Sequence, residues 1–113
     1  MDYLDLIFSG KASSVKELSG GYHHKELAER VLCKDGTKLS VQGSETHYSS
    51  PRQNYGGYYA MEVGFPTVEP PETWREYIDG NWDELDRTKT VYGYVPIEMI
   101  REYVESHGGC INE

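Results

Sequence analysis

The sequence lacks most of the features that assign a protein to a specialised class. It has only two cysteines, Cys33 and Cys110, which follow no metal-binding spacing and are too few for a disulfide framework. We therefore expect two free thiols and no metal site. No apolar run approaches the ~20 residues of a membrane span, and acidic residues stand at the start of the chain where a signal peptide would be basic. These absences favour a cytoplasmic protein that makes no membrane contact.

Motifs for cofactor binding and catalysis are also missing. The glycine pairs Gly20-Gly21 and Gly56-Gly57 fit neither the phosphate-binding loop nor the dinucleotide-binding pattern, so we expect no cofactor. Glu45, His47 and Ser49 supply the groups of a nucleophilic triad, but no strand-turn-helix elbow surrounds the serine. We therefore predict that the protein is not an enzyme.

Length and composition indicate one globular domain. Of the 113 residues, 37% are hydrophobic and 27% are charged, which is typical of a chain that buries a core. We predict a single domain over residues 1–113. Residues 1–24 are expected to form an N-terminal helix and linker, and residues 25–109 an α+β core.

The run 58–65 is the strongest predicted element, because its side chains alternate as in a half-buried strand. Gly56-Gly57 precedes the run and Pro66 follows it, so both of its ends are well defined. We expect a central strand with one face formed by Tyr59, Met61, Val63 and Phe65. The predicted fold class is α+β, a small antiparallel sheet of about four strands packed against two or three short helices. The predicted strands are 27–33, 37–44, 58–65 and 90–95, and the predicted helices are 2–8, 72–79 and 97–107.

The first two strands form a predicted hairpin whose turn is Asp35-Gly36, a pair that supplies the positive φ angles of a tight turn. The residue types of 25–33 also suit a helix. We prefer the strand because the strand that follows the turn needs a partner.

The charge of the chain is unevenly distributed. Acidic and basic residues are equal in number over residues 1–61, so the whole net charge of −8 lies in residues 62–113. Such a chain is a poor direct ligand of nucleic acid and a better ligand of a basic protein surface. In a helix over 72–79, the helical periodicity places Trp74, Tyr77 and Ile78 on the face toward the core. The neighbouring carboxylates then lie on the outer face. We predict one acidic, partner-binding surface formed by Glu69, Glu72, Glu76, Asp79, Asp83, Glu84 and Asp86.

A second candidate site lies in the polar loop between residues 45 and 57, which is long enough to suggest a function. His47, Tyr48, Arg52 and Tyr55 could hold a small anion through a charged contact from the arginine and stacking by the rings. The alternative is that Arg52 pairs with the acidic half of the chain.

Several phrases of the sequence resemble a known group of proteins. They are Lys-Leu-Ser-Val-Gln (38–42), His-Tyr-Ser-Ser-Pro-Arg (47–52), Met-Glu-Val-Gly-Phe-Pro (61–66), Val-Tyr-Gly-Tyr-Val-Pro (91–96) and His-Gly-Gly (107–109). Together they resemble small hypothetical proteins of bacteriophages, prophages and gut bacteria, over residues 35–109. The resemblance implies an accessory role in the cytosol of a bacterial host and transfers no catalytic residue.

Host-defence inhibitors such as anti-CRISPR proteins are similar in size and charge. We therefore expect a phage-encoded protein that binds a basic surface of a host defence nuclease or effector and mimics nucleic acid there. The alternatives are a protein that binds or sequesters a nucleotide signal, and a structural or assembly factor of the phage.

Overall fold

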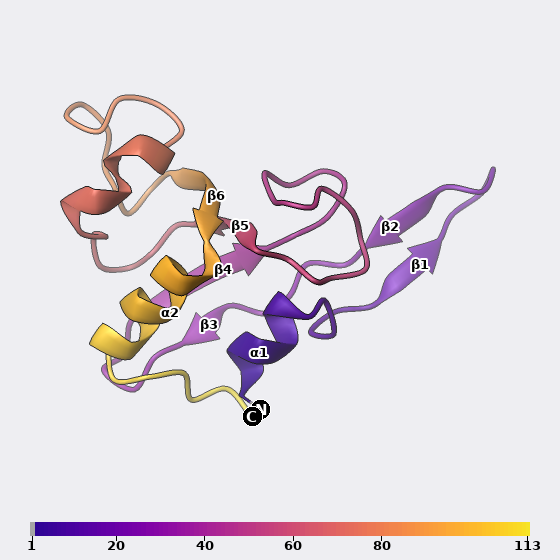
Figure 1. Ribbon diagram of the computed structural model, residues 1–113, viewed down its shortest axis with the longest axis horizontal. Helices are drawn as coiled ribbons and strands as arrows, with labels where there is room; N and C mark the ends of the chain where they lie inside the picture. The colour runs from indigo at the N-terminus through magenta and orange to yellow at the C-terminus, as the bar shows by residue number, and fades with distance from the viewer. Residues whose placement is uncertain (1) are drawn as a thin grey trace.

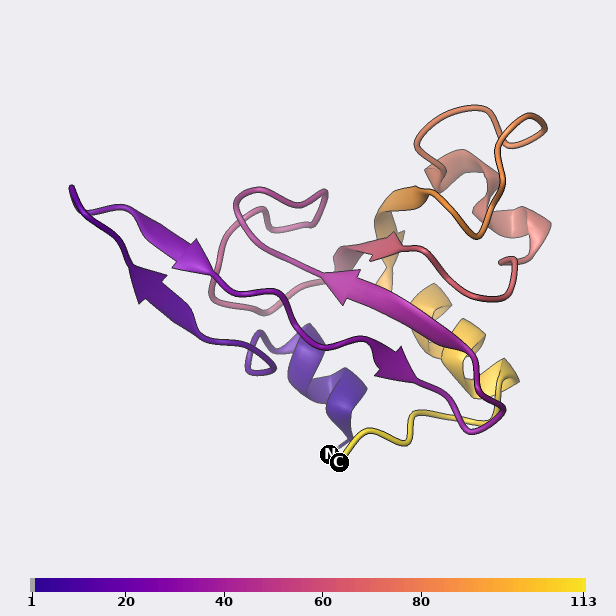
Figure 2. The same cartoon turned by 180° about the vertical axis from the view of Figure 1, so that it is seen from behind.

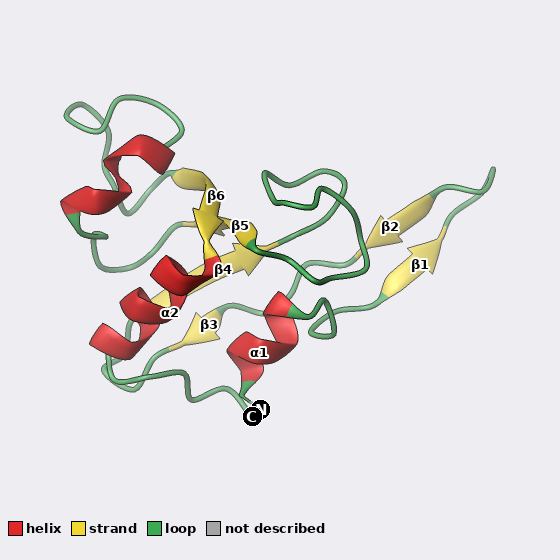
Figure 3. Ribbon diagram, viewed as in Figure 1, coloured by secondary structure: helices red, strands yellow, loops and turns green. Residues whose placement is uncertain are grey.

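Two antiparallel sheets of unequal size organise the chain (Figure 1 and Figure 3), and the computed structural model describes residues 2–113. The smaller sheet pairs β1 (Val15–Glu17) with β2 (His23–Lys25). The larger sheet has the order β3 (Val31–Leu32), β4 (Lys38–Gln42), β5 (Ala60–Gly64) and β6 (Val91–Pro96). The helical segments are α1 (Tyr3–Phe8), the 3-10 helix η1 (Glu72–Tyr77) and α2 (Ile97–Ser106). The predicted α+β class is confirmed.

β5 is an inner strand of the larger sheet, as predicted. Val63 pairs with Val41 of β4 on one side and with Tyr92 of β6 on the other. The predicted face is wrong at both ends, because Tyr59 and Phe65 are 66% and 51% exposed. Tyr59 precedes the strand, Phe65 follows it with a φ of 49°, and a register shift interrupts the β5–β6 pairing next to Met61. The regular alternation therefore does not continue beyond the short strand.

The N-terminal part of the chain differs most from the prediction. The segment expected to be a linker contains β1 and β2, which form a hairpin of their own (Figure 1). The predicted strand 27–33 is reduced to β3, and the alternative helix does not form either. The reason lies in Gln42, whose side-chain amide accepts from the Ala28 amide and donates to the Ala28 carbonyl, both at 2.9 Å. A side chain here satisfies the backbone groups that a strand partner would otherwise bond.

The turn after β3 also differs in detail. Gly36 has a φ of 96°, as a tight turn requires, but Asp35 does not adopt a positive φ. Its side chain instead accepts a hydrogen bond from the Thr37 amide at 2.9 Å. The turn is therefore stabilised by an aspartate side chain and not by two left-handed residues.

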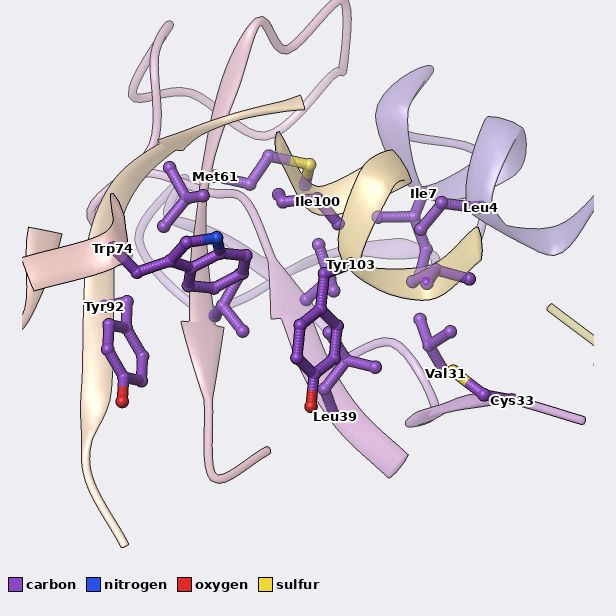
Figure 4. Close-up of a cluster of buried hydrophobic side chains, with 14 of the residues drawn as sticks. Leu4, Ile7, Val31, Cys33, Leu39, Met61, Trp74, Tyr92, Ile100 and Tyr103 are labelled. Atoms are coloured by element: carbon purple, nitrogen blue, oxygen red, sulfur yellow. The ribbon is translucent and has the colours of Figure 1, made fainter. Parts of the chain in front are cut away.

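The core lies between the larger sheet and the helices, as Figure 4 shows. Trp74 of η1 is 1% exposed. The centre of its ring lies 5.5 Å from the centre of the Tyr92 ring and 5.4 Å from the centre of the Tyr103 ring. Arg101 of α2 bonds Asp2 at 2.7 Å and Asp5 at 2.6 Å, so it joins the start of α1 to α2. None of the helices in residues 2–113 is long and apolar enough to cross a membrane.

The loop before β5 packs closely against the end of α1. The Tyr58 amide donates to the Phe8 carbonyl at 3.0 Å. Gly56 has a φ of 94°, and a Cβ there would stand 1.9 Å from the Ser9 carbonyl oxygen, so only glycine fits this contact.

The two ends of the chain lie side by side, whereas the β1–β2 hairpin points away from the body (Figure 2). The Tyr3 hydroxyl donates to the Glu29 carbonyl at 2.8 Å, and the Asn112 side chain donates to the Arg30 carbonyl at 2.9 Å. Both ends therefore contact the same short stretch before β3.

Candidate functional site

The seven carboxylates of the predicted acidic surface are all exposed on η1 and on the segments that flank it. The predicted cause is confirmed, because Trp74 is buried and Tyr77 and Ile78 are partly buried against the core. The 78–90 segment, seen at the upper left of Figure 1, lies at the opposite end of the molecule from the β1–β2 hairpin.

Four of these carboxylates form ion pairs with three neighbouring bases. Arg75 lies 3.0 Å from Asp83 and 3.3 Å from Glu72. Two further pairs join Arg87 to Glu69 at 3.3 Å and Lys89 to Asp86 at 3.9 Å. The hydrogen bond from Arg75 lowers the pKa of Asp83, which favours the charged pair. Because the pairs are exposed to solvent, each contributes little to stability.

Glu76, Asp79 and Glu84 form no ion pair within residues 2–113. Glu76 belongs to η1, and Asp79 follows it where its amide donates to the Val91 carbonyl of β6 at 2.9 Å. Their negative charge is therefore available to a partner. Glu76 also contributes to two hollows, one toward Met99 of α2 and one toward β6.

The hollow toward β6 joins the acidic surface to the loop of the second candidate site. This groove has a volume of about 240 Å³ and is lined by Tyr48, Glu76, Tyr77, Ile78, Asp79, Gly93 and Tyr94. We call it the tyrosine groove. It places three phenol rings beside two carboxylates that form no ion pair with any residue of the described chain.

The walls of the tyrosine groove are held by backbone contacts between the loop and β6. The Tyr94 amide donates to the Tyr48 carbonyl at 2.9 Å, and the two rings are 5.9 Å apart. The Tyr48 amide donates to the Glu62 carboxylate at 2.9 Å. A Cβ at position 93 would lie 3.0 Å from the Tyr48 Cβ, so Gly93 permits this close approach. Tyr94 has a φ of 55°, an uncommon conformation for a bulky residue that accompanies its outward position.

The structure brings together only part of the predicted anion site. The Arg52 guanidinium lies 5.5 Å from the centre of the Tyr48 ring, and its Nε donates to the Glu45 carbonyl at 3.0 Å. Arg52 pairs with no carboxylate within residues 2–113, so the alternative in which it pairs with the acidic half is wrong. Tyr55 is 67% exposed, and within residues 2–113 no hydrogen bond or cation–π contact joins it to Arg52.

His47 is bound to the loop itself. Its Nδ1 lies 2.6 Å from Ser44 Oγ, and burial lowers the pKa of its imidazole. Ser44 is only 3% exposed, and its Oγ also accepts from the Thr46 amide at 3.1 Å. The serine next to the imidazole is thus a buried part of the turn, and it is a different serine from the Ser49 of the sequence motif.

Sequence reasoning identified the carboxylates but missed Tyr77, Gly93 and Tyr94 as parts of one site. The sequence pattern places Tyr94 in a strand, and no local signal relates it to Tyr48. Residues 2–113 contain no group of three or more His, Cys, Asp or Glu residues that could hold a metal ion. Comparison with protein-family models, with curated proteins and with solved structures finds no match for this chain.

Proposed function

We propose that the protein acts by binding the basic surface of another protein, and that the tyrosine groove is the centre of the contact. The observation that carries this proposal is the combination in one groove of three tyrosine rings with Glu76 and Asp79, which have no ion-pair partner within the described residues 2–113. The four carboxylates around it share three basic partners, so they add one net negative charge to this surface.

An arginine or lysine side chain fits this chemistry. A guanidinium stacked on a tyrosine ring gains about 0.5–2 kcal/mol, and a carboxylate beside it adds a charge-assisted hydrogen bond. A phosphate would be repelled by Glu76 and Asp79. Tyrosine also supplies contact area with little loss of side-chain freedom, which is why it is frequent in binding surfaces.

We further propose that the partner is a host defence protein, such as a CRISPR-Cas nuclease or effector, whose nucleic-acid channel the acidic surface occupies. The net charge of −8, which lies entirely in residues 62–113, supports this form of the proposal. The resemblance of the sequence to small phage proteins supports the host context. An inhibitor of this kind presents carboxylates where the channel normally binds phosphates.

The proposal is tested with a charge-matched pair of variants. Partners are captured from a bacterial host lysate on the immobilised chain, purified, and titrated with wild type, with Glu76→Gln/Asp79→Asn, and with Glu17→Gln/Glu113→Gln. Both variants lose two negative charges, and the control residues are exposed outside the tyrosine groove. We expect at least about tenfold weaker binding and a smaller salt dependence for the groove variant only. If all three proteins bound every captured partner with equal affinity, the acidic surface would be only a solvated face with no part in binding, and the proposal would be rejected.

A second candidate is the binding of a small anion such as a nucleotide signal, which the position of Arg52 over the Tyr48 ring favours. A bound nucleotide should raise the Tm of the wild type by mass action and leave Arg52→Ala unchanged. A thermal-shift screen across nucleotides and cyclic nucleotides measures this, and a flat result in the wild type rejects the candidate.

A further inference from the structure

Cys33 and Cys110 oppose each other at the edge of the larger sheet, although they are far apart in the sequence. They form an isolated antiparallel bridge between the end of β3 and the segment that follows α2. The Lys34 amide donates to the Gly109 carbonyl at 3.0 Å, and the Ile111 amide donates to the Leu32 carbonyl at 2.9 Å. These two bonds flank the cysteines, which therefore occupy a non-hydrogen-bonded position, where opposed side chains approach most closely.

A pair of this kind has suitable backbone geometry for a disulfide. The Cα atoms of a non-hydrogen-bonded antiparallel pair are about 4.5 Å apart, and disulfides join Cα atoms that are about 4.4–6.8 Å apart. Asn112 holds the C-terminal segment in register, because its side chain accepts from the Leu32 amide at 2.7 Å and donates to the Arg30 carbonyl at 2.9 Å. The two cysteines are thus aligned while both thiols are free.

The two thiols differ in access. Cys33 is 2% exposed, whereas Cys110 is partly exposed and its Sγ lies 3.4 Å from the Asn112 side-chain oxygen. Burial also raises the pKa of the Cys33 thiol to about 11. A reagent from solution therefore reaches Cys110 first.

We propose that Cys33 and Cys110 form a disulfide when the protein reacts with a small-molecule disulfide such as oxidised glutathione. Cys110 loses its thiol proton, and its sulfur attacks one sulfur of the oxidant, which releases one thiolate and leaves a mixed disulfide. Cys33 then loses its proton to solvent and attacks the Cys110 sulfur, and the second thiol of the oxidant leaves. Two protein thiols are oxidised to one disulfide, and the oxidant is reduced to two thiols.

The bond would fasten the C-terminal segment to β3 and close a loop that contains most of the α+β part of the chain. Constraining so long a loop restricts the unfolded state strongly. The proposal is independent of the tyrosine groove, which contains neither cysteine.

The test uses the full chain, incubated folded with oxidised glutathione and compared with the same sample after reduction. We expect a monomer that has lost both free thiols, a Cys33–Cys110 linked peptide in a non-reducing digest, and a Tm higher by roughly 10 °C that reverts on reduction. Hydrogen exchange at the Lys34 and Ile111 amides should become slower. Cys110→Ser is the control variant and should show no oxidant-dependent shift.

Three outcomes would overturn the proposal. They are a wild type that retains both thiols, one that stops at a glutathione adduct on Cys110, and one that forms only intermolecular dimers. None depends on whether a basic partner is found.

Discussion

Among single residues, Val63 is a core position at which a charge should be poorly tolerated. Its side chain is 0% exposed, between Val41 and Tyr92. Val63→Asp would bury a carboxylate without a partner at a cost of several kcal/mol, comparable with the ~5–15 kcal/mol stability of a typical domain. We expect the variant to lose its cooperative thermal transition, followed by circular dichroism. Tyr59→Asp, at an exposed neighbouring position, should retain it, and a Val63→Asp protein that melts like wild type would show that β5 is not a core strand.

Protonation of the Asp35 carboxylate at low pH should lower the stability of the fold. Hydrogen bonds from Thr37 lower the pKa of its carboxyl from 3.8 to about 2, and His107 Nδ1 contributes from 2.7 Å. Because the folded pKa is depressed, the stabilisation is present above pH 3.8 and is lost as the pH falls toward 2. Asp35→Asn should therefore show a flatter fall of Tm between these pH values. Glu84→Gln, which removes a carboxylate without an ion pair, should follow the wild-type curve; identical curves for all three proteins would contradict the assignment.

Between elements, the contact of the 45–57 loop with α1 depends on Gly56. Gly56→Ala would force a Cβ onto the Ser9 carbonyl, and the substitution also opposes a φ of 94°. We expect a loss of more than about 2 kcal/mol in the free energy of unfolding, measured by urea denaturation. Gly57→Ala is the matched control, because its φ is 68° but no atom lies within 4 Å of the added Cβ, so it should cost only about 1 kcal/mol. Equal losses would mean that the close contact does not form.

Elements could be predicted from the sequence where the signals that form them are local. β4, β5 and α2 follow from alternation or helical spacing ended by glycine or proline, and these signals are local. The reduced length of β3 could not be predicted, because the backbone of Ala28, which precedes it, bonds the Gln42 side chain and not a neighbouring strand. The exposed carboxylates of the candidate site follow from the burial of Trp74. The tyrosine groove does not, because Tyr48 and Tyr94 meet only through the tertiary fold.

For the whole molecule, the concentration of charge predicts a conflict between binding and stability. Glu76 and Asp79 add negative charge to a surface that already contains four paired carboxylates, so they raise repulsion in the folded state. At low salt, Glu76→Gln/Asp79→Asn should have a Tm equal to or above that of wild type. The corresponding gain in the free energy of unfolding should be at most about 1 kcal/mol. The difference should vanish in 1 M salt, where the Debye length is about 3 Å. A lower Tm of the variant in differential scanning fluorimetry would assign these carboxylates a structural role.

The adjacency of the two chain ends makes the molecule suitable for circular permutation. Tyr3 and Asn112 bond consecutive residues, so a short glycine-serine linker could join the ends without disturbing α1 or β3. New ends placed between Gly20 and Gly21, in the connection of the β1–β2 hairpin, would be remote from η1 and the 78–90 segment (Figure 1). An affinity handle attached there would leave the tyrosine groove open to solution during partner capture.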